Sequence, residues 1–525
     1  MKLRHLLFGL LAGVAFVACT NDDDPAGVTP AKDADEVGAT KYMAINFVMP
    51  GDATTRAWDD TFEAATGDEI TVADAQILFF DGEGQVADPF TTGFTDGWTD
   101  GTGSFDKQHA AVIVLKNAIK DPTSVVAILN APKDEQGNAL VTRSTTMTKL
   151  KEITANFRKN PAANLTMINA VYVNGSAVQF ATPVTSNNIK DSESAALGAP
   201  VKIAVEKVVA KVTLTNTSGD TATETQTTGK KDITVAVDGW WLDSTNPQSY
   251  LVKSLATSYE VLGSWEGWND DTNFRSYWAD ALAMTAPEHF KLADATAVAD
   301  EENENPIYAH ENTDQDKKTE LVVAATLTAA DNASSDKSLI KFKGDVYTVN
   351  DFETALYGTI STQYFTRTGD GEQTPFEYNS VEKTAFSFKY TTGGEGVQDY
   401  EAVVTMTYNG SDPLYEYKGT TPVSFTSPSV KVLYWKNGKT YYHIPIIHND
   451  EVTVGTGDAA HPLYGIIRNH LYKVNIKSIT GLGTPIANTD QVIIPVTPPE
   501  DKNTYLAADI VILKYKVVTQ NVNLK

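Results

Sequence analysis

The only cysteine of the chain, Cys19, stands where a thiol would be chemically modified. It ends a segment with Lys2 and Arg4 near the start and an apolar run over residues 6–17. This layout is typical of a bacterial signal peptide, and alanine followed by cysteine at its end is typical of a lipobox. With no second cysteine the chain cannot form an internal disulfide. We therefore expect residues 1–19 to be a lipoprotein signal peptide and the Cys19 thiol to carry a lipid such as palmitate.

A second chemically distinctive position is Arg56, the one basic residue in the small-residue stretch 51–57. A short, exposed segment of glycine, alanine and threonine is a preferred site of proteolysis. A trypsin-like or arginine-specific protease would cut the Arg56–Ala57 bond. The alternative is an ordinary arginine in a surface loop.

The segment just before this loop, residues 41–50, alternates as a β-strand does. It presents four large apolar side chains on one face: Met43, Ile45, Phe47 and Met49. Cleavage after Arg56 would separate this strand from the rest of the chain. We therefore expect residues 20–56 to be a propeptide that holds a polar tether and a removable first strand.

The chain ends in another apolar β-type segment, residues 510–525. One parity carries Val511, Leu513, Tyr515 and Val517, and the other carries Val518, Val522 and Leu524. The change of parity predicts two short strands joined by a register change near residues 517 and 518. The segment is either the last strand of its own domain or a strand that reaches into a neighbouring molecule.

Catalytic and metal-binding patterns are missing from the sequence. His443, His448, His461 and His470 lack the spacing that places two imidazoles on one metal ion, and we interpret them as surface or core residues. The chain has no nucleophile elbow, phosphate-binding loop or dinucleotide fingerprint. Acidic turns such as 81–84 and 269–271 lack the pattern of a calcium-binding loop. We expect no catalytic residues, metal or cofactor, and the chain is not predicted to be an enzyme.

The net charge of −25 argues against nucleic acid as a partner, because phosphate binding needs a basic face. After the signal peptide the sequence has no further apolar run long enough to span a bilayer. Attachment to a membrane would therefore depend on the lipid at Cys19. An acidic run, 21–24, follows the cysteine, and in lipoproteins of Bacteroidota such a run resembles the signal for export to the outer face of the outer membrane.

The body of the chain has the composition of a mainly β protein built from β-sandwiches with few short helices. Alternation predicts strands at 71–81, 110–115, 124–129, 200–215 and 465–479, and a hairpin from 431–435 to 440–447 across an Asn-Gly turn. Helical turns are expected within 147–159 and 190–196. Length favours two domains, 57–215 and 216–500, followed by a terminal segment, 501–525.

Several of these features together resemble the type V fimbrial subunits of Bacteroidia. They are the lipobox, the first strand, the arginine loop, the segment VEKVVAKV at 205–212, the segment GIIRNHLYKV at 465–474, and the tail. Within the family the chain looks most like the shaft subunits of the minor fimbriae of Porphyromonas.

The resemblance implies two tandem transthyretin-like β-sandwiches that are exported as a lipoprotein, cut after Arg56 and polymerised by donor-strand exchange. The removed strand would be residues 41–50, and the donor strand would be residues 511–524. The implied partners are copies of the same chain, anchor and tip subunits, the protease, and the outer membrane before cleavage. The chain would then be a pilin of a surface fimbrium that supports adhesion. A second hypothesis is a monomeric surface lipoprotein that binds glycan or host protein through the tryptophan-rich stretch 263–304.

Overall fold

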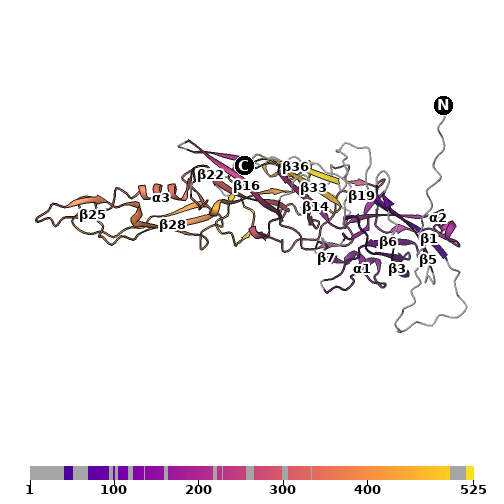
Figure 1. Cartoon of the computed structure of the whole chain (residues 1–525). Helices are drawn as coiled ribbons and strands as arrows, with labels where there is room; N and C mark the ends of the chain where they lie inside the picture. The colour runs from indigo at the N-terminus through magenta and orange to yellow at the C-terminus, as the bar shows by residue number, and fades with distance from the viewer. Residues whose placement is uncertain are drawn as a thin grey trace, which may run out of the picture.

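The computed structural model describes residues 41–50, 69–93, 99–100, 105–115, 122–134, 136–158, 164–216, 221–226, 229–255, 265, 267–297, 305–332, 334–479, 481–496 and 516–524. Within these ranges the protein is mainly β, with three short α-helices: α1 (Met147–Glu152), α2 (Glu193–Leu197) and α3 (Val349–Gly358). Figure 1 shows an elongated molecule with the N-terminal strands at one end and β25 (Phe365–Thr368) near the other. The predicted fold class is confirmed.

The N-terminal part is built on a ten-stranded sheet in the order β3-β2-β6-β8-β13-β1-β5-β4, with β11 and β12 attached. The sheet folds over a core to which β1, β2, β6 and β13 all contribute, which gives a sandwich. Its strands are β1 (Lys41–Pro50), β2 (Ala75–Phe80), β3 (Val86–Gly93), β4 (Thr99–Asp100), β5 (Phe105–Leu115), β6 (Ser124–Leu129), β8 (Met167–Asn169), β11 (Thr182–Pro183), β12 (Ile189–Lys190) and β13 (Val201–Lys207).

The second sandwich packs two sheets face to face around the largest core cluster. One sheet has the order β21-β14-β33-β36 and consists of β21 (Ile307–Ala309), β14 (Ala210–Asn216), β33 (His470–Ile479) and β36 (Lys516–Leu524). The other has the order β15-β16-β22-β30-β34 and consists of β15 (Thr221–Gln226), β16 (Gly229–Asp243), β22 (Glu320–Ala329), β30 (Lys439–Pro445) and β34 (Thr484–Pro485).

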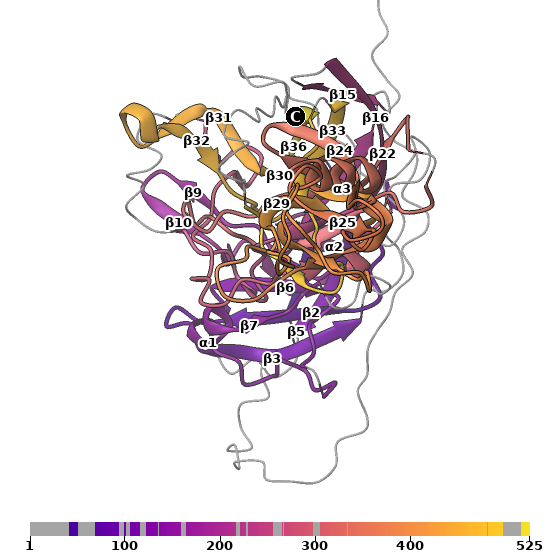
Figure 2. The same ribbon diagram turned by 90° about the vertical axis from the view of Figure 1, so that its left-hand side faces the viewer.

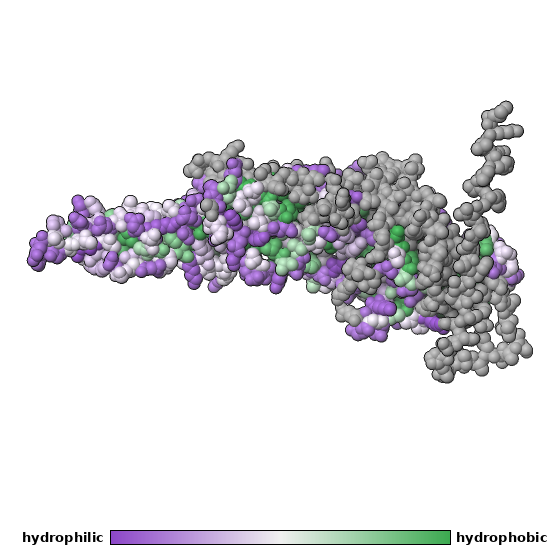
Figure 3. All heavy atoms as spheres, viewed as in Figure 1, coloured by the Kyte–Doolittle hydropathy of each residue, from purple (hydrophilic) through white to green (hydrophobic). Residues whose placement is uncertain are grey.

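A third lobe extends the molecule beyond this sandwich (Figure 1). Its sheet has the order β24-β23-β29-β28-β27, and α3 packs on one face through Phe352 and Leu356. The strands are β23 (Leu339–Phe342), β24 (Asp345–Thr348), β27 (Phe386–Thr391), β28 (Glu401–Tyr408) and β29 (Ser429–Trp435), and a hairpin of β25 and β26 (Glu377–Ser380) lies further out. The face of this lobe in Figure 3 is largely hydrophilic.

Short strands complete the described structure. They are β7 (Thr154–Ala155), β9 (Tyr172–Asn174), β10 (Ala177–Gln179), β17 (Ser249–Tyr250), β18 (Asn269–Asp270), β19 (Arg275–Ser276), β20 (Phe290–Lys291), β31 (Ile447–Val454), β32 (His461–Tyr464) and β35 (Val492–Ile493). The view in Figure 2, along the long axis, shows the hairpin of β31 and β32 standing out from the side of the molecule.

The strands and helical turns predicted from alternation are confirmed, with two corrections. The expected hairpin across residues 436–439 is wrong, because β29 pairs with β23 and β28 whereas β30 pairs with β22 and β34. The turn has the positive φ angles predicted for Asn437 and Gly438, but it carries the chain from one sheet to another. The helix expected over 147–159 ends at Glu152.

The two sandwiches meet at Val208 and Val209, between β13 and β14. Because β14 pairs with β21 and β33, it lies in the second sandwich. We propose this point as the domain join, in place of a boundary after residue 215.

Candidate functional site

The strand β1 lies inside the N-terminal sheet and is paired on both sides. Along one edge it runs antiparallel to β5, from Lys41 opposite Leu115 to Pro50 opposite Phe105. Along the other edge it runs parallel to β13 and, nearer its start, antiparallel to β12. The strand therefore fills a slot whose two walls are β5 and β13.

The side chains of β1 that the structure describes are completely enclosed. Met43, Ala44 and Ile45 are 0%, 1% and 0% exposed. The predicted core positions Met43 and Ile45 are thus buried, in the same cluster as Val201 of β13. Phe47 and Met49 belong to the same strand, but their side chains lie outside the described residues.

The terminal strand β36 lies at the end of a sheet and, among the described strands, pairs only with β33. The pairing is parallel and joins Lys516 to His470 at one end and Leu524 to Ile479 at the other. The predicted tail residues Val517, Val518, Val522 and Leu524 are in this strand, whereas Val511, Leu513 and Tyr515 lie outside the described residues.

The register change expected at residues 517 and 518 is wrong for this arrangement. Val517 pairs with Leu471 and Val518 with Tyr472 in unbroken succession. The irregularity comes later, between Ile476 and Ser478, where β33 has one extra residue. The apolar residues of the tail therefore change from one face to the other without a break in the strand. Leu471 and Tyr472 of β33 lie on opposite faces of the sheet and are both buried, so apolar residues fit on either face at this point.

The slot strand β13 and the tail-bearing strand β33 are linked through the domain join. Asn469, immediately before β33, donates its backbone N–H to the carbonyl oxygen of Val209 at 2.9 Å. Asn469 has a φ of 57°, a left-handed conformation that asparagine tolerates better than most residues. The chain from Val201 to Asn216 thus lines the slot in one sandwich and then runs parallel to β33 in the other.

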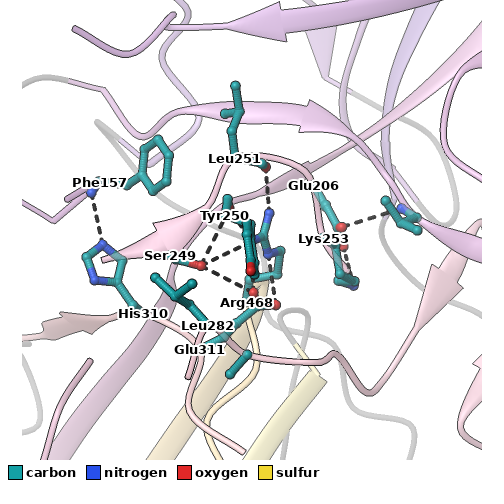
Figure 4. A network of polar contacts seen from close by, with 12 residues as sticks. Phe157, Glu206, Ser249, Tyr250, Leu251, Lys253, Leu282, His310, Glu311 and Arg468 are labelled. Atoms are coloured by element: carbon teal, nitrogen blue, oxygen red, sulfur yellow. Dashed lines mark hydrogen bonds and ion pairs between the residues drawn. The ribbon is translucent and has the colours of Figure 1, made fainter. Parts of the chain in front are cut away.

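A buried ion pair stands at this join (Figure 4). Arg468 donates from Nε and Nη2 to the two carboxylate oxygens of Glu311, both at 2.8 Å, and the two side chains are 0% and 1% exposed. Arg468 also donates to the carbonyl oxygens of Leu251 and Tyr250 at 2.8 and 2.6 Å. A guanidinium is planar and offers five donors, so one side chain ties three segments together.

A second buried pair extends the network into the first sandwich. Lys253 donates from Nζ to Glu206 of β13 at 2.7 Å and to the carbonyl oxygen of Ser276 at 3.1 Å. Burial raises the pKa of Glu206 above its ordinary value, while the charges of Lys253 and Arg468 act in the opposite direction. Because the charged side chains of both pairs are buried away from water, removing one partner would leave the other charge buried without compensation and destabilise the fold.

A neutral histidine makes a third tie. His310 accepts a hydrogen bond at Nε2 from the backbone N–H of Phe157 at 2.9 Å (Figure 4). Its Nδ1 lies 2.8 Å from the carbonyl oxygen of Asn246, to which it donates. Burial, helped by the nearby charge of Arg158, lowers the pKa of His310 to about 3. The imidazole therefore joins the two sandwiches in its neutral form.

Other sequence interpretations have mixed outcomes. Cys19, Arg56 and Ala57 lie outside the described residues. His448 and His470 are core residues, as expected, and lie near Tyr472. In the stretch 263–304, Trp265 and Trp278 are each 6% exposed and pack in a core cluster, so they do not form an exposed platform for a glycan.

The described residues contain no group of histidine, cysteine and acidic side chains that could hold a metal ion. Of the helices described, none has the length and apolar character needed to cross a membrane.

Comparison with solved structures finds similar chains of low identity. A fimbrilin (fimA) from Porphyromonas gingivalis W83 is 12% identical, with 92% of this chain and 97% of that chain covered and a TM-score of 0.34. A cell adhesion protein, described as putative, from Parabacteroides distasonis ATCC 8503 is 11% identical, with 92% and 99% covered and a TM-score of 0.34. The tip fimbrial protein Mfa3 from Porphyromonas gingivalis is 13% identical, with 84% and 95% covered and a TM-score of 0.33.

No curated protein sequence is similar to this chain. A family match covers residues 433–521, which include β33 and most of β36. The family is described as "Major fimbrial subunit protein type IV, Fimbrillin, C-terminal". The predicted relation to the shaft subunits of minor fimbriae stays a prediction. Residues 433–521 thus match the C-terminal region of fimbrillins, in line with the resemblance to fimbrial subunits that the sequence features indicated.

Proposed function

We propose that this chain is a shaft subunit of a cell-surface fimbria and polymerises by strand exchange. Cleavage after Arg56 would release β1, and the C-terminal strand of another copy would fill the empty slot. The observation that carries the proposal is the position of β1 between β5 and β13. Removal of a strand paired on both edges leaves two unsatisfied hydrogen-bonding edges, which a new strand can satisfy.

The energetics support exchange rather than a stable empty slot. Exposing the fully buried Met43 and Ile45 costs about 1.5–3 kcal/mol for each side chain, as an upper estimate. A folded domain has a net stability of about 5–15 kcal/mol. Vacating the slot therefore uses a large part of that stability, and filling it again is strongly favoured.

The terminal strand has properties that suit a donor. Among the strands that the structure describes, β36 pairs with β33 alone, so it would give up this set of ladder bonds and gain two when it enters a slot. It runs parallel to β33, just as β1 runs parallel to β13. A donor strand inserted in the direction of β1 would lie parallel to β13 and antiparallel to β5, which is the pattern that β1 has in the uncut chain.

The slot and the tail belong to different sandwiches, so the contact between copies would be head to tail. A heterologous contact of this kind does not close on itself and produces a fibre. Copies of the chain would form the shaft, with anchor and tip subunits at its ends. No nucleotide or metal is needed in this scheme.

Export would precede assembly. The signal peptide and Cys19 would carry the precursor to the outer membrane as a lipoprotein, and a trypsin-like or arginine-specific protease would release it from its lipid at Arg56. The polar residues 20–40 would serve as the tether between lipid and first strand.

The test is light proteolysis of the purified precursor, followed by electrophoresis in mild SDS to detect a resistant ladder. The wild-type chain should form the ladder, and both Arg56→Ala and a chain lacking residues 511–525 should not. Arg143→Ala, which removes an exposed arginine of the N-terminal sandwich, is the matched control and should behave as wild type. A ladder from the chain without its tail would overturn the proposal.

A further inference from the structure

The run of residues 250–253 contacts both the wall of the slot and the start of the strand that holds the tail. Lys253 donates from Nζ to Glu206 of β13 at 2.7 Å. Three and two residues earlier, the carbonyl oxygens of Tyr250 and Leu251 accept from Arg468 at 2.6 and 2.8 Å. These contacts lie together in Figure 4. One short run of chain therefore connects β13 to the residue pair that precedes β33.

The path continues to the first paired residues of the tail. Arg468 stands two residues before His470, where β33 begins. His470 lies opposite Lys516, where β36 begins. The slot wall and the tail are thus joined through direct contacts between described residues.

The slot wall depends on β1 along half of its length. Residues Val201–Ala204 of β13 pair with β1, whereas Val205–Lys207 pair with β8. If β1 leaves, backbone groups along this edge of the first half lose their partners and must bond to water. Water then reaches the chain two residues from Glu206.

The pair of Glu206 and Lys253 is sensitive to such a change. The two side chains are 3% and 1% exposed in the structure, in which β1 fills the slot. The attraction between two charges is strong in a buried site and falls steeply when water enters. An empty slot therefore weakens the contact that fixes Lys253.

We propose that residues 250–253 couple the occupancy of the slot to the hold on the tail. With β1 in place, Glu206 fixes Lys253, the run fixes Arg468, and β33 keeps the tail strand. With the slot empty this support is lost, and β36 separates from β33 more readily. The inference rests on the proposed strand exchange and adds its regulation: an uncut copy holds its tail, and a cut copy offers it.

The coupling gives the fibre one growing end. Coupling between two sites is reciprocal, so a strand that fills the slot also restores the hold on the tail. At one end of a head-to-tail fibre the last copy has a filled slot and therefore a held tail. At the other end the last copy has an empty slot, which accepts the free tail of an incoming cut copy.

Hydrogen exchange of the tail amides tests the coupling without a polymer. Peptides covering residues 516–524 are followed by mass spectrometry in three states of the chain. The states are the uncut chain, the chain cut at Arg56 and freed of its first strand, and that cut chain refilled with a synthetic peptide of residues 41–50. The cut samples are kept dilute enough to sediment as monomers. The tail should exchange about fivefold faster or more in the empty state than in the other two, the lower end of the usual coupling between sites.

A double variant breaks the path at the slot wall. Glu206→Leu/Lys253→Met replaces the buried pair by apolar side chains of similar volume, a change that proteins often tolerate. Its tail should exchange at one rate whether the slot is empty or refilled. The matched control is Glu353→Leu/Lys383→Met, which removes a partly exposed pair of the third lobe and should leave the slot dependence intact. Peptides of β28 serve as an internal control and should exchange equally in all three states.

Two results would overturn the inference. One is equal exchange of the tail in the empty and refilled wild-type chain. The other is a slot dependence that persists in Glu206→Leu/Lys253→Met. The first comparison needs no substitution, so it decides the matter even if the double variant fails to fold. A first strand that stays bound after the cut, seen from the mass of the complex, would instead mean that the proposed strand exchange itself fails.

Discussion

Ile45 of β1 lies opposite Val201 of β13 in parallel register, and the two side chains share one core at 0% and 3% exposure. The pair ties a strand that we propose to be removable to one that stays. Its contribution to stability should therefore depend on whether the chain has been cut.

The first prediction uses this dependence. Ile45→Ala should destabilise the uncut chain by about 2–5 kcal/mol, the usual cost of deleting a buried side chain to alanine. It should have no effect on the cleaved polymer, from which β1 has gone. Denaturant unfolding of the precursor and the heat resistance of the polymer measure the two effects.

Ile77→Ala is the matched control, because Ile77 is fully buried in the same core but belongs to β2. It should weaken both the precursor and the polymer. A polymer that Ile45→Ala destabilises as much as Ile77→Ala would mean that β1 stays in place.

The second prediction concerns the buried pair at the domain join. Arg468→Met leaves the Glu311 carboxylate buried without its cation, which should cost about 3–5 kcal/mol in denaturant unfolding. Replacing both partners, Arg468→Met with Glu311→Leu, should recover much of this loss. Lys431→Met removes an exposed partner of Glu401 and should cost less than about 1 kcal/mol.

If Arg468→Met lowers the free energy of unfolding no more than Lys431→Met does, the buried network does not hold the two sandwiches together.

The third prediction is a loss of stability in acid that depends on His310. In the folded chain the pKa of His310 is lowered from 6.5 to about 3, so between these values the unfolded chain binds more protons. Its contribution to stability is complete above pH 6.5 and decreases as the pH falls. At pH 5 the loss should be roughly 2 kcal/mol, at 1.36 kcal/mol for each unit.

His310→Gln cannot titrate, so its stability should fall less than that of the wild type between pH 7 and pH 5. Glu206 acts in the opposite direction, because its pKa is raised and acid favours its folded form. The comparison of the two proteins isolates the histidine. Equal slopes in the wild type and the variant would contradict the assignment.

Local pattern was enough to predict the elements that bury one face. The alternation over residues 41–50 gave the bounds of β1, and the run at 124–129 gave those of β6. The pattern could not tell which strands pair. Between β29 and β30, which enter different sheets, Gly438 packs so closely against β22 that an added Cβ would lie 2.2 Å from the carbonyl oxygen of Leu327. This long-range contact cannot be read from the local pattern.

The third lobe has one recognisable local signal, the start of α3. Thr348 caps α3 by accepting from the N–H of Asp351, and threonine with an acid three residues later is a known helix start. The network at the join had no local signal. Arg468 and Glu311 are 157 residues apart, and a single sequence does not indicate that they meet.

The most direct test of strand exchange is a competition between two peptides for the vacant slot. The chain without residues 511–525 is cleaved at Arg56, freed of its first strand, and titrated with a labelled peptide of residues 511–525. The account predicts binding of one peptide per chain, displaced by an unlabelled peptide of residues 41–50 and unaffected by a scrambled peptide of the same composition. Binding that the 41–50 peptide does not displace, or no binding, would contradict the claim that the tail occupies the place of β1.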